Sequence, residues 1–152
     1  MKKSAGPSAR AGHASDLYRE AGRRAGHSAE ILIVGLHAIG FLGVTTQQAA
    51  DDFYPGYAHT FTEIGKERGW PPATRAQFAA LQGPTGTLLI GDAETIAEKI
   101  LYVSEVLGGL SRITFPMGGS ALPHEKMLRS IELLGTRLAP ILRKELTTVS
   151  SH

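Results

Sequence analysis

GDAETIAEKI at Gly91–Ile100 and LPHEKMLRSIELLG at Leu122–Gly135 are the two stretches that decide the fold. In the first stretch, Asp92 is expected to be the N-cap of an amphipathic helix. The second predicts the start of a closing helix. Between them, Arg112–Phe115 is short and apolar enough to be a buried strand. The order of helix, strand and helix predicts β/α units joined by crossover connections.

The helix after Asp92 carries its apolar residues at helical spacing. Its predicted buried stripe is Ile96, Ile100, Val103 and Leu107. The closing helix is expected from about His124 to Glu145, with Pro140 kinking it or ending its regular part. Its expected inward residues are Met127, Ile131, Leu134 and Leu138.

Upstream, the apolar run Ile31–Val44 predicts a single strand that is covered on both faces. Thr45 or Thr46 is expected to cap a helix that Pro55-Gly56 interrupts. Thr74 is expected to start a further short helix. Thr87–Ile90 is predicted to be a short extended piece.

The predicted domain covers residues 16–146, beginning with a helix that Asp16 caps and that ends near Ala25. Residues 1–15 are small, polar and broken by Pro7, and residues 147–152 follow the last helix, so both segments are expected to be flexible. We therefore predict an α/β fold with two or three parallel strands and flanking helices. The order of capped helix, buried strand and closing helix is typical of the tail end of a β/α barrel, so we expect the C-terminal portion of a TIM-type (β/α)8 barrel. A whole barrel needs roughly 200 to 250 residues, more than the 152 of this chain.

Composition excludes several kinds of chemistry. The chain has no cysteine, so it has neither disulfides nor thiolate sites. Its formal net charge is +2, with the basic excess mostly in the first 24 residues. No Lys/Arg-rich stripe with interleaved aromatics continues downstream, so we expect no nucleic-acid partner. Neither a membrane-spanning run nor a secretory signal is evident, which makes a cytoplasmic location the expectation.

The chain resembles the luciferase-like monooxygenases, including their deazaflavin (F420)-dependent members. The resemblance runs in order through LYREAGRRAGH (Leu17–His27), VGLHAIGF, DDFYPGYAHTF, IGKERGWPPATRAQF, LLIGDAETIAEKI, LPHEKMLRSIELLG and RLAPILRKEL. By this comparison Ile31–Val44 is the seventh strand of the barrel and Arg112–Met117 the eighth. The first six strands have no counterpart here. The implied chemistry is that of a monooxygenase or oxidoreductase with reduced FMN or F420 as cofactor.

The candidate cofactor-binding residues are His37, Phe41 and Met117, because a barrel places its ligands at the C-terminal ends of its strands. His37 could bond a flavin or a substrate, or it could be a packed strand histidine with a backbone partner. His124 could contact a ligand or support the start of its helix. The spacing of the histidines fits no local metal motif.

The missing strands leave predicted buried strands without partners. We therefore expect a homo-oligomer, or a complex with the missing N-terminal barrel portion. The leading hypothesis is the C-terminal part of a flavin-dependent monooxygenase or oxidoreductase that is inactive alone. The alternative is a non-catalytic barrel remnant that acts as an oligomeric or partner-bound subunit.

Overall fold

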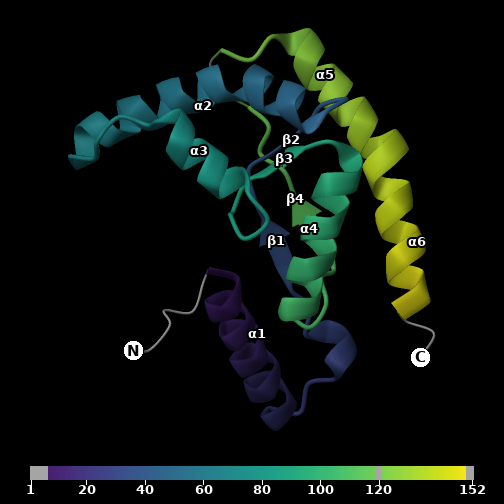
Figure 1. Ribbon diagram of the computed structural model, residues 1–152. Coiled ribbons are helices and arrows are strands. Elements are labelled where there is room, and N and C mark those ends of the chain that lie inside the picture. Colours follow the sequence, from purple (N-terminus) through teal and green to yellow (C-terminus); the bar gives the residue numbers. More distant parts are fainter. Residues whose placement is uncertain (1–6, 119–120, 150–152) are drawn as a thin grey trace.

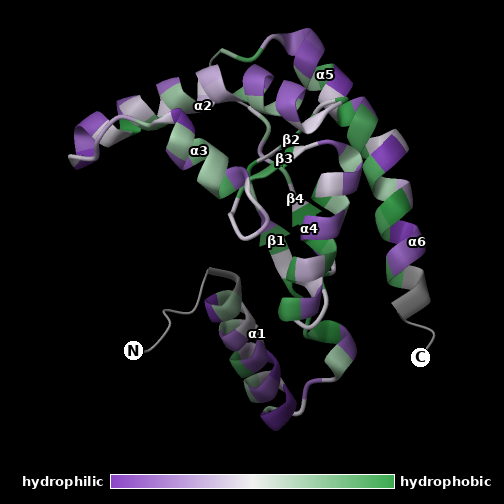
Figure 2. Ribbon diagram, viewed as in Figure 1, coloured by the Kyte–Doolittle hydropathy of each residue, from purple (hydrophilic) through white to green (hydrophobic). Residues whose placement is uncertain are grey.

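The structure is a computed structural model that describes residues 7–118 and 121–149. Helices surround a small centre of short strands, as Figure 1 shows, and hydrophobic residues lie both in that centre and along the helices (Figure 2). The strands are β1 (Gly35–His37), β2 (Gly40–Leu42), β3 (Leu89–Gly91) and β4 (Arg112–Thr114). The helical segments are α1 (Pro7–Arg24), η1 (Ala29–Ile31), α2 (Thr46–Arg68), α3 (Arg75–Gln82), α4 (Ala93–Val106), α5 (His124–Leu133), η2 (Leu134–Leu138) and α6 (Ala139–Val149).

The strands form two parallel pairs. β1 pairs with β4, with Leu36 opposite Ile113, and β2 pairs with β3, with Phe41 opposite Ile90. The predicted α/β class with parallel strands and flanking helices is therefore confirmed. The two predicted strands at Arg112–Phe115 and Thr87–Ile90 are present as β4 and β3.

The prediction of one continuous strand over Ile31–Val44 is wrong. The chain changes partner at Ala38 and Ile39: the Ala38 N–H donates to the Thr114 carbonyl at 3.1 Å, whereas the Ile39 carbonyl accepts from Leu89 at 2.8 Å. Gly40 permits the change, because a Cβ there would lie 2.2 Å from the Phe115 ring. Continuous apolarity indicated burial, but it carried no information about which strand each part would pair with.

Two apolar clusters hold these pairs in place. One lies between α4, η2 and the strands and includes Leu42, Ile96, Ile100 and Leu138, with Leu36 and Ile113 packed against it. The other lies under α2 and α3 and includes Phe41, Phe53 and Phe78, in which the Phe41 and Phe53 rings stack at 5.4 Å.

α4 matches its prediction closely. The Thr95 N–H donates to the Asp92 carboxylate at 2.8 Å, so Asp92 is the N-cap. Ile96, Ile100 and Leu107 are buried, and Val103 is half-buried. α3 begins with Thr74 as predicted, and Thr74 and Gln77 cap it reciprocally in a capping box.

α1 begins at Pro7, not at Asp16, so the predicted helix start is wrong and residues 7–15 are helical. Proline suits the first turn of a helix, because backbone N–H groups there have no acceptor within the helix and the lack of one costs no hydrogen bond. Residues 1–6 lie outside the described residues, as do 150–152, whereas residues 147–149 belong to α6.

α1 is attached to the C-terminal end of α4 through polar contacts. The Ser15 hydroxyl donates to the Leu107 carbonyl at 2.8 Å, and the Arg19 guanidinium donates to the same oxygen and to the Gly109 carbonyl at 3.0 Å. A Cβ at Gly12 would lie 2.8 Å from the Val106 carbonyl oxygen, so glycine allows the helices to approach closely. These contacts satisfy carbonyls that the end of α4 leaves without helical partners.

α2 continues through Pro55 and Gly56, so the predicted interruption is wrong. The packing of this helix explains the difference. Tyr57 and Tyr54 on either side of the proline both pack against the ring of Phe78 in α3, at 5.1 and 5.2 Å. Tertiary contacts thus hold the helix across a residue that would end it in isolation.

The closing helix is confirmed, but its register differs from the prediction. A π-helical segment, η2, ends next to Ala139-Pro140 and breaks the regular α-helix where Pro140 was expected to do so. Ile131 was predicted to face inward and is 49% exposed, whereas Ser130 is fully buried. The reason is a hydrogen bond: the Leu42 N–H donates to the Ser130 hydroxyl at 2.8 Å, which turns that side of α5 toward β2.

The first prediction concerns α4. Ile100→Ala should lower the free energy of unfolding by about 2 to 5 kcal/mol, because Ile100 is 1% exposed and its loss leaves a cavity. Asp92→Ala should cost only about 0.5 to 2 kcal/mol, since it removes a single cap. Urea denaturation of both variants measures this order. A smaller loss for Ile100→Ala than for Asp92→Ala would contradict the packing described here.

Candidate functional site

The β1–β4 pair has one covered face and one open face. Leu36 and Ile113 point into the core under α4. Their neighbours alternate to the other side. Four residues, Gly35, His37, Arg112 and Thr114, are exposed there. In a β/α barrel the helices cover the outer face of the strands, so this open face is the one that corresponds to a barrel interior.

His37 and Thr114 form the polar end of this face. They lie opposite each other in the register, at the C-terminal ends of β1 and β4. Imidazole and hydroxyl groups can each donate and accept hydrogen bonds. Because barrel ligands bind at the C-terminal ends of strands, this pair is the candidate binding position on the open face.

The structure does not bring the three predicted site residues together. His37 is exposed on the open face. Phe41 is 2% exposed in the cluster under α2 and α3, and Met117 is 8% exposed in the cluster beside α4. Cofactor contact stays a prediction for all three, and His37 is the one whose side chain is accessible. Residues 119 and 120, which follow the segment that carries Met117, lie outside the described residues.

Ser130 supports the segment that follows β4, and nothing in the sequence singled it out. Its hydroxyl accepts from the Leu42 N–H and donates to the Met117 sulfur at 3.8 Å. It therefore joins β2, α5 and the segment that follows β4. A lone serine between charged and apolar residues carries no signal that would have revealed this role.

Lys99 is a second residue that the sequence did not reveal. It is 8% exposed, and its ammonium donates to the carbonyls of Gly83 and Leu88, both at 2.7 Å. The carbonyls of Leu81 and Gln82 lie at 3.4 and 3.3 Å. Lys99 thus holds the segment that leads from α3 into β3.

Burial lowers the pKa of the Lys99 ammonium from 10.5 to about 8. The residue lies on the wall of a pocket of about 580 Å³ between α3 and α4, which Thr46, Thr95 and Tyr102 also line. Its ammonium bonds backbone carbonyls, so the geometry supports a structural role, and the pocket lies apart from the open face of β1 and β4.

Within residues 7–118 and 121–149, no group of three or more His, Cys, Asp or Glu side chains is placed to hold a metal ion. None of the helices in the same part of the chain is long and apolar enough to cross a membrane.

The arrangement of strands and helices defines a partial β/α barrel of the kind found in monooxygenases. The chain matches the crystal structure of monooxygenase RslO1 from Streptomyces bottropensis with a TM-score of 0.67 and 21% identity, covering 88% of this chain and 38% of that one. It also matches the oxygenating constituent of 3,6-diketocamphane monooxygenase from Pseudomonas putida, a type II Baeyer-Villiger monooxygenase solved with FMN. There the TM-score is 0.59 and the identity 19%, covering 87% of this chain and 40% of that one.

These matches confirm the predicted resemblance to luciferase-like monooxygenases at the level of the fold. The chain spans about two-fifths of the length of the solved proteins that it matches. No family model matches the sequence, and no curated protein does.

The second prediction concerns Lys99 and pH. The folded chain releases the Lys99 proton near pH 8, whereas the unfolded chain keeps it to about pH 10.5. Between these values the unfolded state binds more protons, so this group makes the folded state more stable as pH rises. Relative to Lys99→Met, the wild type should therefore gain up to about 3 kcal/mol between pH 8 and 10.5.

Urea denaturation of both proteins over this pH range measures the difference. Both proteins share all other titratable groups, so the contributions of those groups to the pH dependence cancel in the comparison with Lys99→Met. A wild-type free energy of unfolding that stays constant or falls relative to that of Lys99→Met as pH rises would contradict the assignment of the lowered pKa to Lys99.

Proposed function

We propose that this chain is the C-terminal sector of a flavin-dependent monooxygenase or oxidoreductase, and that its open β1–β4 face forms part of the flavin pocket. The observation that carries the proposal is the exposed pair of His37 and Thr114 at the C-terminal ends of two parallel barrel strands. The FMN bound to the oxygenating constituent of 3,6-diketocamphane monooxygenase supports a flavin as the ligand class.

The residues present fit one side of a flavin site. The His37 imidazole can donate to, or accept from, a ring nitrogen or carbonyl, and the Thr114 hydroxyl offers a second polar contact beside it. Both side chains are exposed, so the described part of the chain supplies no opposite wall for a flavin ring. FMN or F420, when bound, would supply the redox chemistry, and this chain would contribute orientation and hydrogen bonds.

A non-catalytic role is the second candidate. It is supported by the same open face, since a remnant that has lost its catalytic partners would also expose it. The two functions differ in one property. A pocket-forming sector should gain flavin binding once the barrel is completed, whereas a structural subunit should associate without binding flavin.

The third prediction concerns flavin binding. The isolated chain should bind FMN and F420 weakly or not at all, because a flavin needs phosphate anchoring and ring packing together and only one sector is present. Titration of the purified chain with each flavin, followed by fluorescence quenching, measures this. Tight, stoichiometric binding by the isolated chain would contradict the prediction.

The fourth prediction assigns the contact. In a completed barrel, His37→Ala should weaken flavin binding about 5-fold to 10-fold, which corresponds to the loss of roughly one hydrogen bond. His59→Ala is the matched control, because His59 is also exposed but lies on α2. If the two variants bind flavin with equal affinity, His37 does not contact the flavin.

A further inference from the structure

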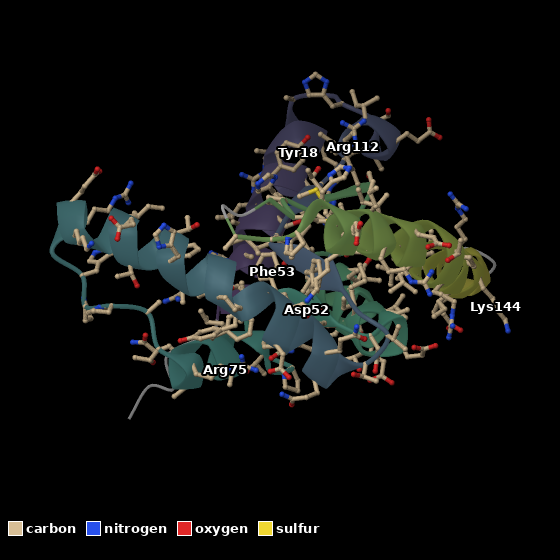
Figure 3. The ribbon with its side chains drawn as sticks, turned by 90° about the horizontal axis from the view of Figure 1, so that it is seen from above. Tyr18, Asp52, Phe53, Arg75, Arg112 and Lys144 are labelled. Atoms are coloured by element: carbon tan, nitrogen blue, oxygen red, sulfur yellow. The ribbon has the colours of Figure 1, made fainter. Side chains whose placement is uncertain are left out.

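We propose that the pocket between α3 and α4 is a binding site for a small apolar monocarboxylate, which accepts a hydrogen bond from the Lys99 ammonium. The pocket has a volume of about 580 Å³ and lies apart from the open β1–β4 face. Figure 3 shows Arg75, the first residue of α3, toward one side of the molecule and Arg112 of β4 toward the other. The inference therefore does not depend on the proposed flavin function.

The wall of the pocket favours an apolar ligand. It is built from α3, α4, the start of α2 and residues 83–85, which lead from α3 toward β3 (Figure 1). Ala79, Pro84 and the ring of Tyr102 contribute to it, and most of its surface is apolar. Its volume lies within the range of known small-molecule sites, which are mostly apolar and carry few polar groups.

The Lys99 ammonium is the polar group that would hold such a ligand. An ammonium has three N–H donors, and the carbonyls of Gly83 and Leu88 accept two of them at 2.7 Å. The carbonyls of Leu81 and Gln82 lie at 3.4 and 3.3 Å, which is long for a hydrogen bond. One N–H is thus left with long contacts alone, and it can donate to a ligand oxygen.

The charge of Lys99 favours an anionic ligand. Lys99 is 8% exposed, and no carboxylate in the described part of the chain forms an ion pair with it. A buried charge without a counter-charge is costly, and burial is what lowers the pKa of this ammonium to about 8. A carboxylate beside it would provide the missing counter-charge.

The other charged groups of the wall limit the ligand to a single negative charge. Among the described residues that line the pocket, Lys99 is the only cation, and the other titratable groups are Glu98 and Tyr102, both exposed on α4. One positive charge near Glu98 cannot balance a doubly charged phosphate. A monocarboxylate with an apolar body therefore fits both the charge and the surface of the pocket.

Isothermal titration calorimetry with octanoate and octanamide tests the proposal, because these two probes differ only in the head group. Octanoate should bind at least about 10-fold more tightly, since it adds a hydrogen bond between charged groups. Its affinity should fall about 5-fold to 10-fold from pH 7 to pH 9, because the protonated fraction of Lys99 falls from about 0.9 to about 0.1. The affinity for octanamide should not change over this range.

Two pairs of variants locate the ligand. Lys99→Met should abolish the preference for octanoate, whereas Lys66→Met should not, because it removes the same charge from a side chain that is 67% exposed on α2. Ala79→Phe should fill the pocket and weaken the binding of both probes at least about 10-fold. Ala76→Phe is its matched control, since Ala76 is also exposed on α3 but does not line the pocket.

Equal affinities for octanoate and octanamide would overturn the proposal, as would binding of neither probe or an octanoate affinity that does not depend on pH. Unchanged binding by Ala79→Phe would place the ligand elsewhere and overturn it as well. If circular dichroism shows that Lys99→Met does not fold, the pH dependence of the wild type and the pair of alanine variants still decide. None of these outcomes involves a flavin, so failure here is distinguishable from failure of the proposed function.

Discussion

The parallel pairing of β1 with β4 is the constraint on which the rest of this structure depends. Parallel neighbours cannot be joined by a tight turn and need a crossover connection. Here the crossover contains β2, α2, α3, β3 and α4. α4 returns across one face of the pair and buries Leu36 and Ile113, and nothing in the described chain returns across the other. Within the described residues, this face of the pair therefore stays open.

Polar side chains, of which Ser15, Lys99 and Ser130 are buried, fix the ends of elements around this pair. Arg19 and Ser15 bond the carbonyls at the end of α4, Lys99 bonds those of the segment before β3, and Ser130 bonds the backbone of β2. Each side chain satisfies backbone groups that would otherwise be buried without a partner, a costly condition. These bonds fix the end of α4, the start of β3 and the position of β2 against α5.

The sequence was sufficient where local chemistry decides the structure. The cap at Asp92, the buried stripe of α4 and the capping box at Thr74 follow from residue type and spacing, and all are present. It was insufficient where distant contacts decide. The apolarity of Ile31–Val44 carries no information on which strands its two halves pair with. The presence of Pro55 predicts a helix break, because the packing against Phe78 that keeps the helix continuous is not visible in the local sequence.

The candidate site was predicted only in part, for the same reason. His37 is accessible at a strand end, as a barrel requires, but Phe41 and Met117 are buried in separate clusters once the strand is split. No sequence motif marks Lys99 or Ser130, because both residues bond backbone carbonyls or amides that are distant in the sequence.

The open face and the candidate site both require that β1 and β4 lie side by side. Nuclear Overhauser contacts between the backbones of residues 35–38 and 112–114 in the isolated chain test this pairing most directly. We expect contacts in parallel register, with Leu36 beside Ile113 and His37 beside Thr114. Antiparallel contacts, or none between these segments, would contradict it.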